Sequence, residues 1–253
     1  SRYLTGWSTM RKSIKAFAAL IALLFTVSIY AATEIELEPA LNDPDNVNSL
    51  QRGARNFMNY CSGCHSAQYV RFNTLGRDLN LSEEQLVNNL MFNAEKTFET
   101  IEATMPMDEA LRWFGQAPPD LSLIARARGT DYVFNFLKGF YRDPDSPTGV
   151  DNRVLAGTSM PHGLWELQGF QNAVFSTDES GIEHFESFEQ VTPGSMSAEE
   201  YDEFVRDTTN FLEYISEPIR STRRVLGVWV LIFLVFFWII ASMLKKQIWK
   251  DVT

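Results

Sequence analysis

The chain has 253 residues, enough for one or two domains, and its hydrophobic fraction of 45% and charged fraction of 21% are those of a folded protein. Its 32 acidic residues against 22 basic ones give a net charge of −10. This balance argues against a nucleic-acid partner, because a protein that binds nucleic acid needs a basic face. The two cysteines are too few for a scaffold built on disulfides.

The charge is unevenly distributed along the chain. Residues 1–32 hold four basic residues and no acidic one, and residues 221–253 hold five basic residues and one acidic residue. Residues 33–220 therefore hold 13 basic and 31 acidic residues, a net charge of −18. Such a field would attract cationic partners and slow anionic ones. The alternative is that the acidic residues serve only solubility.

The N-terminal region is typical of an export signal. Three basic residues between Arg11 and Lys15 precede an apolar run at Ala16–Ile29, and small residues follow at Ala31–Ala32. A basic flank, a short apolar stretch and a small-residue cleavage site are the parts of a secretory signal peptide. We therefore predict that residues 1–32 are upstream residues and a signal peptide, with an uncleaved anchor as the alternative.

The residues that follow are predicted to form an exported domain over residues 33–220, which begins with a polar lead-in and a helix. Leu50, Ala54, Phe57 and Cys61 follow an i, i+4, i+7, i+11 pattern, which is the spacing of one helix face. The spacing predicts a helix over residues 49–66, capped by Asn48 or Ser49, whose last turn carries the cysteines.

The strongest motif is Cys61-Ser62-Gly63-Cys64-His65, a pattern typical of covalent haem attachment. The two thiols reach the two vinyl groups of one haem as thioethers, and His65 then lies under the iron. A redox pair would need a βαβ context, a zinc site would need two further ligands, and a disulfide between Cys61 and Cys64 would be tight. We therefore predict one covalently bound haem c, with Cys61 and Cys64 binding the cofactor and His65 the iron.

Two capping boxes mark the starts of later helices. Ser82 is followed after three residues by Gln85, and Ser197 by Glu200, so that each serine and its partner can satisfy two backbone donors. The helix after Ser197 is expected to end at Glu217-Pro218, because a proline breaks or kinks a helix.

The middle of the chain is predicted to hold two further helices and a loop-rich segment. Asp120 or Ser122 is expected to cap one helix, and Thr130 to cap the next over Asp131–Tyr141. Residues 142–196 are rich in Gly, Pro and Asp, which predicts loops with a few short strands.

Val225–Leu244 is a run of twenty uncharged residues, fourteen of which are Leu, Ile, Val or Phe. As a helix the run would cross about 30 Å of hydrocarbon, and these side chains favour insertion by ~4–8 kcal/mol. A buried core helix is the alternative, but the run leaves no polar face. We predict a transmembrane anchor over residues 221–244. Because basic residues flank both ends, the export signal decides the orientation and puts residues 245–253 in the cytoplasm.

The second axial ligand of the iron is not decided by spacing. Met or His usually lies opposite the first histidine, and Met raises the reduction potential. Met105-Pro106-Met107 and Met160-Pro161 stand out, because a proline restricts the backbone before it and can hold a ligand loop rigid. The candidates beyond the motif are Met91, Met105, Met107, Met160, Met196, His162 and His184.

With these elements in place, the chain resembles the cytochrome c1 family, the haem subunits of the quinol:cytochrome c oxidoreductase known as the cytochrome bc1 complex. The resemblance covers nearly all of residues 33–253. It rests on a combination of motifs, since Cys-x-x-Cys-His alone is shared by all c-type cytochromes. These motifs are Cys61–His65, Pro118–Ser122, Ala125–Arg128, Asp131–Phe134, Met160 and the single C-terminal span.

The resemblance implies roles for individual residues. Met160 would be the axial ligand opposite His65. Arg128 would pair with a haem propionate, a carboxylate that matches the guanidinium fork, with Arg126 as the alternative. No catalytic residue is implied. The further residues implied to bind the haem are Pro119, in a turn that would wall the haem edge, and Tyr132.

The resemblance also implies a mostly α, cytochrome c-like haem domain with long loop insertions and one C-terminal transmembrane helix. Such a subunit would take electrons from a Rieske iron–sulfur protein and pass them to a cytochrome c, beside cytochrome b in a dimeric, proton-translocating complex. Its expected place is a bacterial inner membrane, with the haem domain on the periplasmic side. Two alternatives stay open: a free-standing membrane-anchored shuttle cytochrome, and a haem enzyme or sensor with an open iron position.

Overall fold

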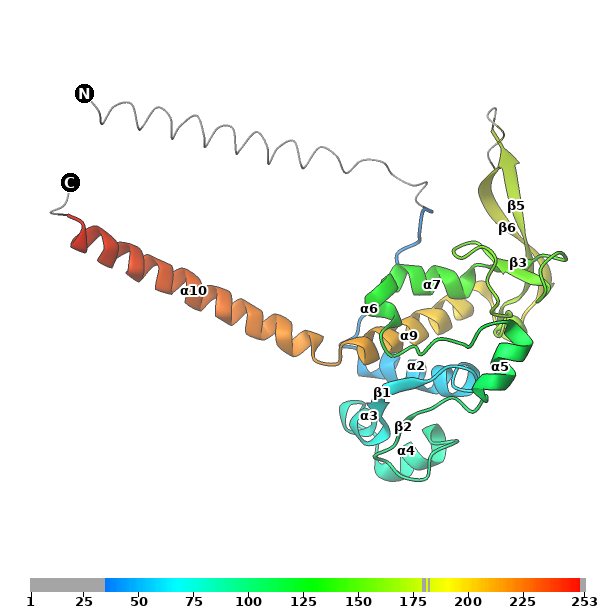
Figure 1. The fold of residues 1–253 in the computed structure, drawn as a ribbon, viewed down its shortest axis with the longest axis horizontal. Coiled ribbons are helices and arrows are strands. Elements are labelled where there is room, and N and C mark those ends of the chain that lie inside the picture. The colour runs from blue at the N-terminus through cyan, green and yellow to red at the C-terminus, as the bar shows by residue number, and fades with distance from the viewer. Residues whose placement is uncertain (1–34, 179–180, 182, 251–253) are drawn as a thin grey trace. The chain divides into compact units, whose positions relative to one another are not determined.

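The computed structural model describes residues 35–178, 181 and 183–250, so the predicted signal segment lies outside the described residues. The described residues form helices, three two-stranded antiparallel sheets and a long C-terminal helix, which confirms the predicted mostly α fold (Figure 1). In chain order the elements are α2 (Val47–Tyr60), β1 (Ala67–Arg71), α3 (Phe72–Asp78), α4 (Glu83–Leu90), β2 (Thr100–Ile101), α5 (Met107–Phe114), α6 (Ile124–Arg128), α7 (Thr130–Lys138), β3 (Phe140–Arg142), β4 (Val150–Asn152), α8 (Trp165–Gln168), β5 (Gly169–Thr177), β6 (Glu183–Pro193), α9 (Ala198–Ser216) and α10 (Arg220–Ile248).

Helices α2 and α9 pack against each other and form the centre of the core (Figure 1). Ala54, Phe57 and Phe211 are fully buried, and the two phenylalanine rings lie 5.6 Å apart between centroids. Gly53 makes the close approach possible, because a Cβ at this position would lie 2.1 Å from the carbonyl oxygen of Asp207. The apolar face predicted for the helix before the motif is therefore the face that packs on α9.

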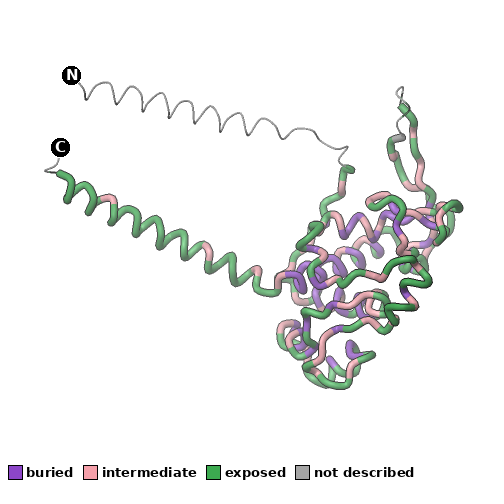
Figure 2. The backbone as a smooth tube through the Cα atoms, viewed as in Figure 1, coloured by how far each residue is buried: buried purple, intermediate pink, exposed green. Residues whose placement is uncertain are grey.

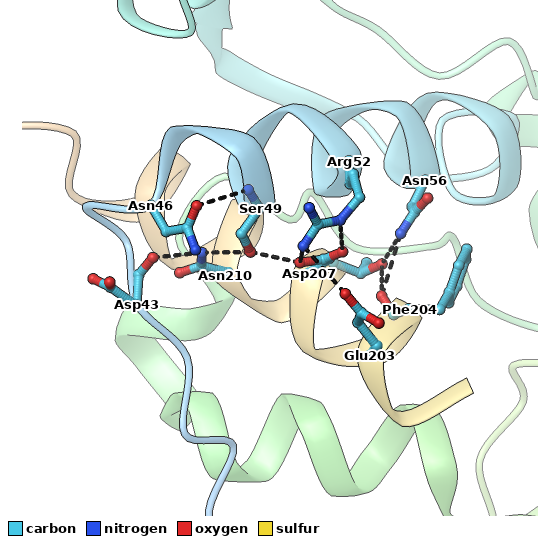
Figure 3. A network of polar contacts seen from close by, with 10 residues as sticks. Asp43, Asn46, Ser49, Arg52, Asn56, Glu203, Phe204, Asp207 and Asn210 are labelled. Atoms are coloured by element: carbon cyan, nitrogen blue, oxygen red, sulfur yellow. Dashed lines mark hydrogen bonds and ion pairs between the residues drawn. The ribbon is translucent and has the colours of Figure 1, made fainter. Parts of the chain in front are cut away.

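A buried polar network fixes the register of α2 on α9 (Figure 3). The Asp207 carboxylate is 5% exposed and accepts hydrogen bonds from the Ser49 hydroxyl at 2.6 Å and from two nitrogens of Arg52 at 2.5 and 2.9 Å. Asn210 donates to Ser49 at 2.9 Å, and Asn56 donates to the backbone of α9 at 3.2 Å. The hydrogen bond from Arg52 to the Asp207 carboxylate raises the pKa of Arg52.

The two predicted capping boxes are confirmed at α4 and α9. The hydroxyls of Ser82 and Ser197 accept hydrogen bonds from the backbone N–H of Gln85 and Glu200, each at 3.2 Å. The side chains of Gln85 and Glu200 accept in return from the N–H of the two serines, at 2.9 and 2.8 Å. The chain therefore fixes both helix starts locally.

The N-terminal caps predicted for helices α6 and α7 are wrong. Helices α6 and α7 begin without a side-chain cap, and Thr130 is the first helical residue of α7 rather than its cap. Asp120 and Ser122 instead accept long-range hydrogen bonds from strand β1. The Asp120 carboxylate holds the N–H of Gln68 at 2.9 Å, and the Ser122 hydroxyl holds that of Tyr69 at 3.1 Å. Tertiary contacts therefore occupy the oxygens that a local pattern assigns to capping.

The segment over residues 142–196 contains more strand than predicted. Strands β5 and β6 are nine and eleven residues long and form a hairpin, which Figure 1 shows clearly. The pairing register shifts twice, after Phe170 and after Val174. Such bulges interrupt the alternation of side chains between the two faces, which is the signal that reveals a strand in a sequence.

The break predicted at Glu217-Pro218 is confirmed, because α9 ends at Ser216 and α10 begins at Arg220. Helix α10 has 29 residues, is long and apolar enough to cross a membrane, and buries none of its residues (Figure 2). Arg223 pairs with Glu217 across the break at 2.7 Å. The predicted anchor is therefore a single continuous helix that follows directly on the core helix α9.

Gly53→Ala is expected to lower the free energy of unfolding by about 1–3 kcal/mol, because the added methyl group overpacks the contact between α2 and α9. Gly227→Ala in α10 is the matched control, since a Cβ there has no atom within 4 Å. Thermal unfolding of the haem-loaded protein in detergent measures both. A melting temperature unchanged by Gly53→Ala would contradict the close approach.

Candidate haem-binding site

The Cys-x-x-Cys-His motif forms a tight turn directly after α2. The helix ends at Tyr60, and the N–H groups of Cys64 and His65 both donate to the carbonyl of Cys61, at 3.0 and 2.8 Å. The helix is therefore shorter than the predicted range of residues 49–66. A separate turn, rather than the last turn of the helix, carries the two cysteines.

The two thiols of the turn are free. Cys61 is half-buried and Cys64 is exposed. Burial raises the pKa of Cys61 to about 12 and also raises the pKa of Cys64. Within residues 35–178, 181 and 183–250, no three His, Cys, Asp or Glu side chains gather as metal ligands. Among these residues the turn therefore lacks the further ligands that a zinc site needs.

A backbone carbonyl orients the imidazole of His65. Its Nδ1 lies 2.8 Å from the carbonyl oxygen of Pro119, which can only accept, so Nδ1 donates and Nε2 keeps its lone pair for a metal. Burial lowers the pKa of His65, which favours the neutral, ligating form. Pro119 was expected to wall a haem edge. Its carbonyl also orients the His65 ring, a role that cannot be predicted from sequence because every residue has a backbone carbonyl.

Two segments hold the turn in place through the backbone. The carbonyl of Gly63 accepts a hydrogen bond from the N–H of Met105 at 3.0 Å. Ser66 accepts two more, from the N–H of Ala103 through its hydroxyl and from the N–H of Leu121 through its carbonyl, each at 2.8 Å. The segments that precede α5 and α6 therefore lie beside the motif, and the contribution of Ser66 was not anticipated from its sequence.

Helix α5, which begins two residues after Met105, presents apolar side chains that the described residues do not cover. Only Ala110 is buried, whereas Met107, Leu111 and Trp113 are 63%, 50% and 57% exposed. An exposed apolar surface beside a functional motif marks a binding region. A haem attached at the neighbouring turn is a large and mainly apolar group, so these residues fit the cofactor.

The structure brings Arg128 and Tyr132 together. The Arg128 guanidinium lies over the Tyr132 ring, 5.4 Å from its centroid, and Tyr132 stacks on Phe136 at 6.2 Å. Arg126 and Arg128 are both exposed at the end of α6, and neither forms an ion pair within the described residues. Both guanidinium groups are therefore available for a propionate, and the choice between them stays a prediction.

Met160 lies half-buried in the loop between β4 and α8. Its N–H donates to the hydroxyl of Thr158 at 3.3 Å, and the carboxylate of Asp151 accepts from the N–H of Gly157 at 2.7 Å. These bonds order the loop on the N-terminal side of Met160. Its ligation of iron opposite His65 stays a prediction.

Met105 is half-buried beside the motif, to which its N–H is bonded, and it stays a candidate. The remaining candidates lie in the core, on α5, on the hairpin or among aromatic rings. Met91 is 8% exposed in the core, Met196 packs against the core, and Met107 is exposed on α5. His184 bonds an aspartate at 2.9 Å on the hairpin. His162 is 6% exposed among aromatic rings, and burial lowers its pKa to about 4.

A free Cys-x-x-Cys-His turn on a mostly helical domain, followed by one helix of membrane-spanning length, is the arrangement of a membrane-anchored haem protein. A model described as the Cytochrome C1 family matches residues 41–252. The chain therefore belongs to the cytochrome c1 family. Family membership makes it an electron-transfer subunit of a bc1-type oxidoreductase, with a haem c cofactor.

Three individual proteins show what the chain is similar to. The chain is 45% identical to a cytochrome c1 of Allochromatium vinosum, over 96% of this chain and 100% of the relative. It is 39% identical to a protein of Nitrosomonas europaea named ammonia monooxygenase gamma subunit, over 95% of this chain and 99% of the relative. It is 26% identical to a cytochrome b/c1 of Bradyrhizobium diazoefficiens, over 80% of this chain and 33% of that longer relative.

Asp120→Ala is expected to lower the free energy of unfolding by about 0.5–1.5 kcal/mol, because it removes the carboxylate that accepts hydrogen bonds from the N–H of Gln68 in β1 and from the N–H of Ser122. It also loosens the carbonyl that orients His65, so the reduction potential of the haem should shift. Denaturant unfolding and a redox titration measure the two effects. Asp145→Ala, at an exposed turn, is the control and should change neither.

Proposed function

We propose that this chain holds one covalent haem c and relays single electrons from a Rieske iron–sulfur protein to a cytochrome c, within a proton-translocating quinol:cytochrome c oxidoreductase. The observation that carries the proposal is the turn with two free thiols and a histidine oriented by the Pro119 carbonyl, in a chain of the cytochrome c1 family. When bound, the haem supplies a one-electron redox centre.

The residues of the site divide the work of holding this group. Cys61 and Cys64 would hold it through thioethers, and His65 Nε2 and the sulfur of Met160 would bind its iron. With ligands from both residues the iron would have no place for a small substrate, so the chain needs no catalytic residue of its own.

The remaining predicted residues bind the edge of the group. Arg128 pairs with a propionate. Its guanidinium also makes a cation–π contact with the Tyr132 ring, 5.4 Å from the ring centroid, which would hold it in place. Arg126 is the alternative partner for the propionate. Pro119 serves through its carbonyl on His65 and walls the haem edge through its ring.

The partners follow from the anchor, the charge and the relatives. The Bradyrhizobium relative is named cytochrome b/c1, which supports a complex with cytochrome b, and a dimer of that complex is part of the proposal. Helix α10 anchors the chain in a bacterial inner membrane with residues 33–220 on the periplasmic side. The net charge of −18 over those residues suits a cationic cytochrome c acceptor.

Purification in mild detergent followed by addition of quinol tests the function. We expect b-type haem and an iron–sulfur subunit to copurify, and quinol to reduce the c haem in a manner that a quinol-site inhibitor blocks. A chain that purifies alone and stays oxidised would instead be a free-standing anchored cytochrome. Copurification with an ammonia-oxidising enzyme would support the role that the name of the Nitrosomonas relative describes.

Met160→Leu is expected to open the sixth position of the iron. The oxidised protein should lose the long-wavelength absorption band of sulfur-to-iron ligation, the reduction potential should fall, and the reduced protein should bind carbon monoxide. Met91→Leu is the matched control, because Met91 is 8% exposed and packs in the core. An unchanged spectrum in Met160→Leu, or a lost band in Met91→Leu, would show that Met160 is not the ligand.

A further inference from the structure

His162 is a buried imidazole that the proposed electron relay does not use. It is 6% exposed and stacks face to face on Phe140, with ring centroids 5.0 Å apart and planes 9° apart. Phe170 meets the same imidazole edge-on at 6.2 Å and 80°. Phe140 is itself 2% exposed, so the stack belongs to the interior of the domain.

Aromatic packing is the main contact of this ring. Neither Nδ1 nor Nε2 of His162 forms a hydrogen bond of good geometry within the described residues, although the Gly169 backbone and the Gln168 side chain lie close enough to oppose the effect of burial on its pKa. The ring therefore behaves here as a flat side chain of aromatic shape. A buried polar group without a hydrogen bond destabilises a fold. The contacts that stabilise His162 at this position are therefore those of its ring with the two phenylalanines.

His162 is tied closely to Met160 by the backbone between them. Pro161 is the only residue that separates the two, and its ring restricts the conformation of Met160. The chain then turns tightly, with the N–H of Gly163 on the carbonyl of Pro161 at 2.8 Å. On the other side of Met160, its own N–H bonds Thr158 at 3.3 Å. Met160 therefore sits between a polar anchor before it and the stacked imidazole after it.

The stack continues toward the residues predicted to bind the haem edge. Phe140 meets Phe136 edge-on at 5.2 Å, and Phe136 stacks on Tyr132 at 6.2 Å. The Arg128 guanidinium lies over Tyr132. A continuous series of packed rings thus joins the Met160 loop to the arginine at the end of α6.

We propose that His162 is a positioning residue, whose packing between Phe140 and Phe170 holds the Pro161 turn and so places the sulfur of Met160 for ligation of the iron. This inference rests on the proposed function, in which Met160 is the axial ligand. His162 acts through its shape and not as a ligand. A side chain of the same shape should therefore replace it, and a small side chain should not.

Two substitutions in the haem-loaded complex test the inference. His162→Ala should lose the sulfur-to-iron absorption band, lower the reduction potential and let the reduced haem bind carbon monoxide. His162→Phe keeps the stack and should retain all three properties of the unaltered protein. Leu86→Ala is the control for general loosening: Leu86 is 2% exposed on α4, so its truncation should lower the melting temperature and leave the band unchanged.

Three results would overturn the inference. His162→Ala with an intact band and no carbon monoxide binding would show that the loop does not need the stack. His162→Phe without the band would show that a ring nitrogen, rather than the shape, is required. Met160→Leu with an unchanged spectrum would remove the premise, and this failure of the proposed ligand is seen without altering His162.

Discussion

The pairing of Asp207 on α9 with Arg52 on α2 is the constraint on which the rest of the structure depends. Helix α2 ends directly at the Cys-x-x-Cys-His turn, and α9 leads within three residues to the membrane-length helix α10. The buried carboxylate accepts from Arg52 and Ser49, and Gly53 lets the two backbones meet. Loss of Arg52 would leave the buried Asp207 carboxylate without its cation, whereas the Arg52 side chain is 42% exposed and can be solvated. Only one register of the two helices satisfies these groups, so the position of the turn is set by the core.

Backbone groups then do most of the positioning at the site itself. The Pro119 carbonyl selects the tautomer of His65, and the Gly63 carbonyl fixes the turn against the segment before α5. Asp120 contributes through its carboxylate, but it too binds backbone N–H groups and not another side chain. The side chains named by the motif would supply the bonds to the haem. Backbone carbonyl and N–H groups from segments distant in the sequence position those side chains.

Local patterns predicted the features whose causes are local. The capping boxes at Ser82 and Ser197, the break at Pro218 and the apolar run of α10 each depend on a few neighbouring residues, and all are confirmed. The caps assigned to Asp120 and Ser122 failed because β1, more than fifty residues earlier, occupies their oxygens. The hairpin of β5 and β6 was hidden by its bulges. At the site, the motif could be recognised from side chains, whereas the role of the Pro119 carbonyl and the burial of His162 depend on tertiary packing.

The short connection between α9 and α10 limits how far the domain can travel from its anchor. Three residues separate the two helices, and a fully extended chain of that length spans at most about 10 Å. The pairs Arg223–Glu217 and Arg220–Glu213 shorten this tether further. Electron tunnelling weakens steeply with distance, so a stationary centre can serve only partners that come to it. A domain tethered in this way cannot move far from its helix. Where a donor and an acceptor lie farther apart than electrons can tunnel, another protein has to move between them.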